Sequence, residues 1–198
     1  MRSTQLSDVD ERFISWLEEL SVKANDEKTT PQERSRARAA LAAFRRGLGK
    51  PPGSAVEMLR YIPSYVYSGD RGVYMDIYLL IASLFASHPA LGGTGSIGST
   101  LAEVRAARDS NSIEARFVAL LNCHDDELFK HLRYAIALAK SSKSRVPVNW
   151  RQLLADLKQW RRSKDQVRQR WARDFWGRSQ ADSQEEADED QHIVVDNQ

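Results

Sequence analysis

Apolar residues recur every three or four positions along most of the chain, which is the spacing that places them on one face of a helix. Val9, Phe13, Leu17, Leu20 and Ala24 share one such face near the start of the sequence. No run of residues alternates between apolar and polar in the way of a half-buried strand. The pattern therefore predicts an all-α fold.

Polar residues and prolines mark where the predicted helices begin. Ser7 is suited to cap the first helix, and Thr-Pro-Gln-Glu at 30–33 combines a capping box with proline at the first helical position, opening a helix that runs to Gly47. Ser54 and Glu57 repeat the capping pattern before a short helix. The remaining predicted helices cover residues 71–87, 100–108, 113–122, 126–141, 150–161 and 165–176.

A glycine-dense segment, residues 92–99, divides the chain. It formally matches the Gly-x-Gly-x-x-Gly motif of dinucleotide-binding folds, but that motif needs a preceding strand and an acidic residue about 20 positions later. Here a predicted helix precedes it and no βαβ unit follows. We therefore expect no cofactor, and a linker that joins two small helical bundles, residues 1–91 and residues 100–178.

Charge is distributed unevenly, although the formal net charge is only +2. Residues 182–198 contain seven acidic residues and no Lys or Arg, which predicts a disordered acidic tail over residues 179–198. Without those seven acids, the chain has 29 basic residues against 20 acidic ones. The basic residues concentrate in segments 31–50 and 133–178, which indicates surfaces that face a polyanion.

Several features argue against a secreted or membrane protein. The single cysteine, Cys123, excludes an intrachain disulfide, and the first ten residues contain no signal-peptide core. The most apolar stretch, residues 73–86, contains Asp76 and is shorter than the ~20 residues that span a bilayer. It reads as a buried helix, and the whole predicts a cytoplasmic protein without membrane contact.

Candidate catalytic and metal-binding groups form no recognisable site in the sequence. His124 and His131 lie close to the acidic run 125–127, but neither paired cysteines nor HExxH spacing accompanies them, and acidic residues there are typical of a helix cap. Cys123 is expected inside an apolar helix, and the Asp and Glu residues outside the run 125–127 are scattered along the chain. We expect no catalytic residue, no metal and no small-molecule substrate.

Within the basic segments, each predicted helix separates apolar residues from a row of positive charge. In the second helix Arg34, Arg38 and Arg45 lie in line beside the apolar face, with Arg46 at the helix end. Basic side chains about 5–6 Å apart on a helix can follow the phosphates of a nucleic acid without reading its sequence. The helices after residues 126 and 149 carry similar rows, made of Lys130, Arg133, Lys140, Arg151, Lys158 and Arg162.

The tryptophans of the last third of the chain are candidates for base stacking. Trp150, Trp160, Trp171 and Trp176 lie at helical spacing with leucines. At such spacing an aromatic residue more often belongs to the core. We therefore expect these four side chains to be buried.

A helix-turn-helix transcriptional regulator is the alternative function. Residues 150–161, a short turn and a capping box at 163–166 resemble that motif, and a regulator would place Gln166, Arg168 and Arg170 against base edges. The second helix, however, already has a complete apolar stripe, and no effector-binding domain is evident. Sequence-tolerant binding is the preferred interpretation.

Several segments together have the order and character of one known family. They are the Arg-rich helix at 36–46, Gly-Ser-Ile-Gly-Ser-Thr-Leu at 95–101, Glu-Ala-Arg-Phe at 114–117, Leu-Leu at 120–121, His-Leu-Arg at 131–133, Val-Asn-Trp-Arg-Gln-Leu-Leu at 148–154 and Trp-Ala-Arg-Asp-Phe at 171–175. In these the chain resembles the CasB family, the small subunit of the type I-E CRISPR surveillance complex Cascade. The resemblance covers roughly residues 10–177 and leaves out the acidic tail.

The resemblance implies two helical bundles and no nuclease activity. It also implies DNA and guide RNA as ligands, the backbone and large subunits of Cascade as neighbours, and a second copy lying side by side with the first. The implied role is to hold the displaced strand and the guide or target strands, so that the R-loop persists for the helicase-nuclease that later cuts. The family's basic positions match Arg45, Arg46, Arg116, Arg133, Arg161, Arg162 and Lys164, and the basic helices add Arg34, Arg38, Lys140, Lys143 and Arg168.

Overall fold

Helices make up all the regular secondary structure in the part of the chain that the computed structural model describes, namely residues 6–51, 54–67, 74–107 and 111–195. Side chains are described in the same ranges, apart from Asn111 and those after Gly177. The α-helices are α1 (Asp8–Asn25), α2 (Pro31–Gly47), α3 (Met75–Ser87), α4 (Ile97–Ala106), α5 (Asn111–Asn122), α6 (Leu128–Ser141) and α7 (Trp150–Val195). The all-α prediction is confirmed.

The first two helices begin at the caps that the sequence predicts. Ser7 and Asp10 form a capping box, in which the Asp10 carboxylate accepts from the Ser7 backbone N–H at 3.0 Å. The Thr30 hydroxyl oxygen accepts from the backbone N–H of Glu33 at 3.3 Å. The short helix predicted after Ser54 is present, but Ser54 does not cap it. The Ser54 hydroxyl donates to the carbonyl oxygen of Pro51, and the chain forms the 3-10 helices η1 (Val56–Tyr61) and η2 (Ser64–Val66), neither of which has a side-chain cap.

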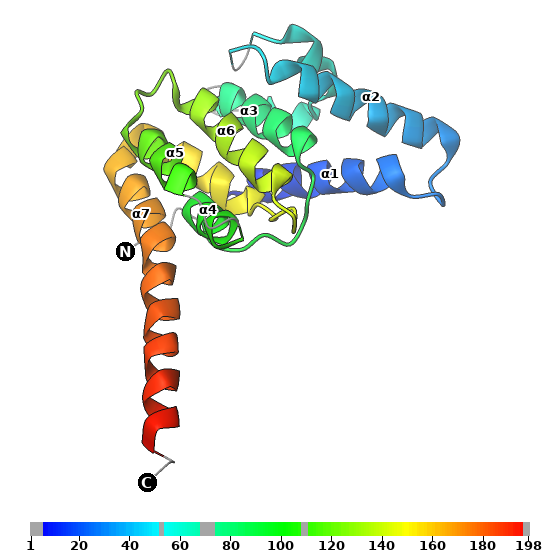
Figure 1. Cartoon of the computed structure of the whole chain (residues 1–198). Helices are drawn as coiled ribbons and strands as arrows, with labels where there is room; N and C mark the ends of the chain where they lie inside the picture. Colours follow the sequence, from blue (N-terminus) through cyan, green and yellow to red (C-terminus); the bar gives the residue numbers. More distant parts are fainter. Residues whose placement is uncertain (1–5, 52–53, 68–73, 108–110, 196–198) are drawn as a thin grey trace.

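The helices share one core. α1 and α2 run antiparallel and form an arm at one side of the molecule, while α7 contacts α1, α3 and α4 (Figure 1). Buried residues of all seven α-helices belong to a single hydrophobic cluster. Across the glycine-rich segment, for example, the rings of Phe85 and Trp150 pack edge to face with centroids 5.5 Å apart. The division into bundles of residues 1–91 and 100–178 stays a prediction.

α3 is the buried helix expected from the most apolar stretch of the sequence. Tyr78, Ile81 and Phe85 have no exposed surface. α3 packs against α2, α6 and α7, which lie around it. Within the described residues, no helix is long and apolar enough to cross a membrane.

The glycine-rich segment ends inside a helix. Ser96 caps α4 by accepting from the backbone N–H of Gly98 at 3.1 Å, so the last three residues of the predicted 92–99 linker are helical. α4 crosses α7 so closely that a Cβ on Gly98 would overlap the carbonyl oxygen of Trp171. Gly98 is therefore a packing residue at a helix crossing, where the absence of a side chain allows the two backbones to approach closely.

α7 is bent and long. Ser163 has non-helical backbone angles (φ −154°, ψ 61°), which separates the two helices that the sequence predicts at 150–161 and 165–176. Beyond the body, which consists of α1 to α6 and the 3-10 helices, the backbone of α7 continues as a helix to Val195. This part of α7 projects away from the other helices (Figure 1). The acidic segment predicted to form a tail, residues 179–198, thus lies outside the packed helices as far as it is described. No Pro or Gly follows Gly177 to stop the helix.

Candidate nucleic-acid interface

Arg34 and Arg38 stabilise the connection between α1 and α2 through hydrogen bonds to backbone carbonyls. Arg34 Nη2 donates to the carbonyl oxygens of Glu27 and Thr29 at 3.0 and 2.8 Å, and Arg38 Nε donates to that of Ala24 at 2.9 Å. Cationic donors at the C-terminal end of a helix satisfy carbonyls that the helix leaves unpaired. These two predicted phosphate-binding residues thus have a structural role at this connection, although Arg38 remains exposed.

The C-terminal end of α2 meets α6 through Arg133. Its Nη1 donates to the carbonyl oxygen of Leu48 at 2.9 Å, joining positions 85 residues apart in the sequence. Lys50 and Arg133 line one small cavity at this junction. Arg45 and Arg46 are exposed in the last turn of α2, just before Leu48. The structure therefore brings the basic end of α2 next to the basic helix α6.

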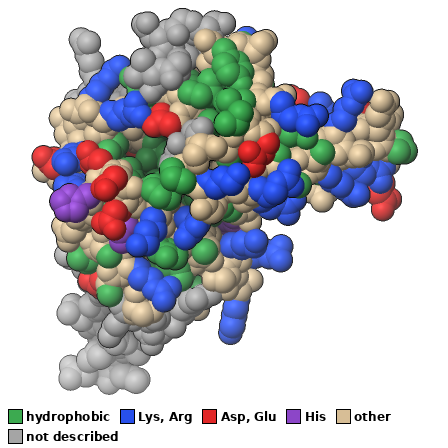
Figure 2. Space-filling model, turned by 90° about the horizontal axis from the view of Figure 1, so that it is seen from above, with side chains coloured by type: hydrophobic (Ala, Val, Ile, Leu, Met, Phe, Trp, Pro, Cys, Tyr) green, Lys and Arg blue, Asp and Glu red, His purple; other side chains and the backbone are tan. Residues whose placement is uncertain are grey.

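The outer side of α6 carries positive charge and no acid. Lys130, Arg133 and Lys140 lie outside its buried stripe, and Lys143 follows the helix. α6 contains neither Asp nor Glu, and no described carboxylate pairs with any of these four cations. Figure 2 shows Lys and Arg gathered across the middle of the face seen from above and along the arm. We call Lys130, Arg133, Tyr134 and Lys140 the α6 face.

The first half of α7 uses its cations to bind other helices. Arg151 bridges to Glu11 at 2.8 Å and to Glu18 at 2.6 Å, both on α1. Lys158 donates to the buried Asp10. Burial acts to raise the pKa of Asp10, but hydrogen bonds from Lys158, Tyr78 and Ser7 outweigh it, and the pKa is lowered. Arg151 and Lys158 therefore tie α7 to the body.

The predicted binding residues around the bend of α7 also have partners. Three pair with acids and one with a tyrosine: Arg161 with Asp76, Lys164 with Asp125 at 3.7 Å, Arg168 with Asp165 at 3.7 Å, and Arg162 with the Tyr74 hydroxyl at 2.8 Å. A cavity of about 430 Å³ beside the bend is lined by Asp76, Asp125 and Asp126 as well as Arg161. Acids at this position oppose the approach of phosphates. The bend is therefore less suited to a nucleic acid than the α6 face.

The helix-turn-helix alternative needs arginines that point outward from the second part of α7. Arg170 instead donates to the fully buried Asp156 at 2.5 Å, and Arg168 donates to the carbonyl oxygen of Cys123 at 3.0 Å. Burial raises the pKa of Asp156, against donors that include Trp171 and Arg170. Because these arginines hold the bend together, the geometry does not favour a base-reading helix.

The acidic run before α6 has a different role from the one predicted. α6 begins only at Leu128, with Glu127 at the N-cap and no side-chain cap. Asp125 accepts a hydrogen bond from Trp160 Nε1 at 3.0 Å, so it fixes a buried ring of α7 instead of capping α6. Nowhere in the described part of the chain do three or more His, Cys, Asp or Glu side chains gather as metal ligands would.

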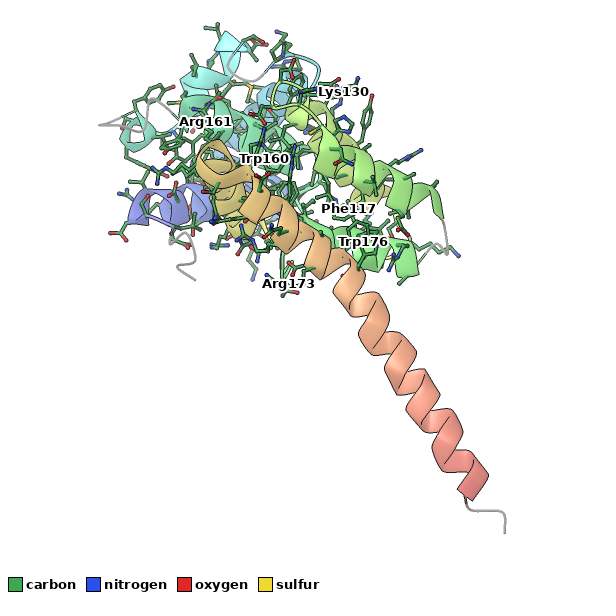
Figure 3. All side chains as sticks on the ribbon, turned by 90° about the vertical axis from the view of Figure 1, so that its left-hand side faces the viewer. Phe117, Lys130, Trp160, Arg161, Arg173 and Trp176 are labelled. Carbon is green, nitrogen blue, oxygen red and sulfur yellow. The ribbon has the colours of Figure 1, made fainter. Side chains whose placement is uncertain are left out.

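The tryptophans lie in or against the core. Trp150, Trp160 and Trp171 are at most 4% exposed, and Trp176 packs on Phe117 with centroids 5.5 Å apart. Figure 3 shows three aromatic residues between α7 and the helices packed against it: Trp160, Phe117 and Trp176. It shows Lys130 and Arg173 at the edge of the molecule. The core assignment is confirmed for the three buried tryptophans.

Arg116, one of the predicted nucleic-acid-binding residues, is exposed on α5.

Sequence reasoning missed Tyr134. Its side chain is 46% exposed and lies beside the cations of α6. The available signal was its position on the helix: Lys130, Tyr134, Ala137 and Ser141 fall together, opposite the apolar stripe. The helical position of Tyr134 therefore predicts an exposed aromatic ring among cations.

Comparison with known proteins identifies the family. Residues 40–176 match the model of the family described as CRISPR-associated protein Cse2. A protein of that name from Thermus thermophilus is 34% identical over 170 residues, which cover 84% of this chain and 89% of the relative.

Solved structures agree with this match. The crystal structure of CasB from Thermus thermophilus has a TM-score of 0.68 and 30% identity, covering 87% of this chain and 99% of that one. That of M. ruber CasB has a TM-score of 0.68 and 29% identity, covering 91% and 98%. The resemblance found in the sequence is thus confirmed, and the chain belongs to the Cse2 (CasB) family of CRISPR-associated proteins.

Proposed function

We propose that this subunit of CRISPR Cascade is non-catalytic and binds the backbones of DNA and guide RNA without reading their sequence. The observation that carries the proposal is the α6 face, whose cations have no acidic partner among the described residues and adjoin the basic end of α2. A surface of this kind gains free energy by releasing counterions from phosphates. It therefore suits many sequences equally.

The role in Cascade follows from the energetics of strand exchange. Replacing a DNA duplex by a guide RNA–DNA duplex is close to balanced, so modest backbone contacts shift the equilibrium. We assign to the α6 face and Arg46 the task of holding the displaced strand or the guide–target duplex. The R-loop then persists for a separate nuclease. Within the complex we place the chain against the backbone and large subunits, with a second copy at its side.

The test is a pair of matched double variants. Lys140→Glu/Lys143→Glu reverses charge in the last turn of α6 and just after it. Lys23→Glu/Lys28→Glu makes the same changes in the last turn of α1 and just after it. Affinity for DNA is measured by fluorescence anisotropy across a salt series. We expect the α6 variant to lose at least about tenfold in affinity at low salt, and the slope of log K against log salt to fall by about 0.7–0.9 per lost contact.

Two results would contradict the proposal. Equal losses in both variants would show that net charge alone governs binding. Unchanged binding in the α6 variant would remove the α6 face from the interface. The same variants, assembled into the complete complex, should then shorten R-loop lifetime only when binding by the isolated protein is lost.

A further inference from the structure

Tyr134 is an exposed aromatic ring set among cations. It lies one helical turn after Lys130, and the Arg133 guanidinium carbon is 5.5 Å from the centroid of its ring. Lys140 lies further along the exposed side of the same helix. Water therefore reaches the ring within a surface that attracts phosphates.

This arrangement distinguishes single strands from duplexes. Aromatic rings beside a cationic track are the usual means of holding unpaired bases, because every base has a face on which a ring can stack. In a duplex the faces of the bases are already stacked on one another. Phosphates are present in both forms, so the cations alone do not separate them.

We propose, on the basis of the function proposed above, that Tyr134 stacks on an unpaired base and gives the α6 face a preference for single-stranded nucleic acid. Lys130 and Lys140 hold the phosphates on either side, and the ring supplies the contact that a duplex lacks. Arg133, which donates to the Leu48 carbonyl and lies over one face of the ring, leaves the other face for the base. The strand is the occupant best matched by charge, since α6 offers cations and no acid. A protein partner on the same face is the competing outcome.

Four other large aromatic residues do not offer this contact. Trp150, Trp160 and Trp171 are buried. Tyr67 has nearly the same exposure as Tyr134, at 45%, but its hydroxyl donates to the carbonyl oxygen of Leu59 at 2.7 Å, beside the 3-10 helices. It therefore provides a matched control for losing an exposed tyrosine.

The experiment compares Tyr134→Ala, Tyr134→Phe and Tyr67→Ala on three ligands of equal length: single-stranded DNA, duplex DNA and a single strand whose sugars carry no bases. We expect Tyr134→Ala to weaken single-strand binding about tenfold and to leave duplex binding within twofold. Tyr134→Phe keeps the stacking ring and should bind as the wild type does. On the abasic strand, wild type and Tyr134→Ala should bind equally.

The outcomes separate this inference from the function on which it rests. If wild type binds none of the ligands, the proposed function fails. If binding and its salt dependence are normal but Tyr134→Ala changes nothing, or weakens single strand, duplex and abasic strand alike, only the stacking role fails. A loss confined to assembly of the complex would assign Tyr134 to a protein interface and overturn the inference.

Discussion

The α6 face and the part of α7 between Arg151 and Arg170 are both rich in basic residues, but they use their charge differently. On α7, acids from α1, α3 and the segment before α6 neutralise the cations, as the pair of Arg151 with Glu18 illustrates. On α6, no described acid pairs with Lys130 or Lys140. The positions of distant acids therefore decide whether the cations of a helix form ion pairs that stabilise the fold or stay available to a ligand.

The comparison predicts its largest effect at Asp156. Asp156→Ala leaves the Arg170 guanidinium and the Trp171 indole N–H without their buried acceptor. We expect a loss of about 3 kcal/mol in the free energy of unfolding, measured by urea denaturation. Asp165→Ala is the control, because the Asp165 side chain is 81% exposed and its ion pair with Arg168 is long, at 3.7 Å. It should change stability by less than about 0.5 kcal/mol, and equal losses would refute the structural role given to α7.

The next effect concerns Asp10 and depends on pH. Its folded pKa is lowered, so the ionised carboxylate stabilises the fold at pH values above the ordinary Asp pKa, and this contribution disappears as the pH falls through the lowered value. Asp10→Asn should cost about 2 kcal/mol at pH 7. Unfolding free energies measured from pH 7 downward should converge for wild type and variant in acid. A constant difference across this range would contradict the role of the charge.

The sequence predicts those features that depend on neighbours along the chain. The caps at Ser7 and Thr30, the buried stripes and the bend near Ser163 follow from local spacing and agree with the structure. The start of α6 does not agree with the prediction. Asp125, the acid expected to cap α6, instead accepts a hydrogen bond from the indole of Trp160, 35 residues away. Long-range acceptors of this kind are not visible in the periodicity of either helix.

The same limit applies to the candidate site. Rows of Arg and Lys on α2, α6 and α7 are visible in the sequence. Which rows are neutralised depends on acids up to 148 residues away, as in the contact between Lys158 and Asp10. Tertiary structure therefore decides which predicted residues can meet a ligand.

A smaller and opposite pair of effects separates Arg151 from Lys130. Arg151→Ala should lower the free energy of unfolding by about 1 kcal/mol and leave DNA affinity unchanged, because it breaks contacts between α1 and α7. Lys130→Ala should leave stability within about 0.5 kcal/mol and weaken DNA binding a few-fold with a shallower salt dependence. Thermal unfolding and anisotropy on both variants measure the contrast. Reversed results would exchange the roles of the two surfaces.

The smallest effect tests whether neutralisation is what keeps α7 out of the interface. Asp76→Asn removes the acid paired with Arg161, a residue whose side chain is 41% exposed. If pairing suppresses binding there, affinity for DNA should rise about twofold at low salt, and the gain should vanish at high salt because exposed charges are screened. Glu103→Gln, on exposed α4 surface, changes net charge equally. An equal gain in both variants would trace the effect to net charge, and no gain in either would show that α7 lies outside the path of the strand even when the acid paired with Arg161 is neutralised.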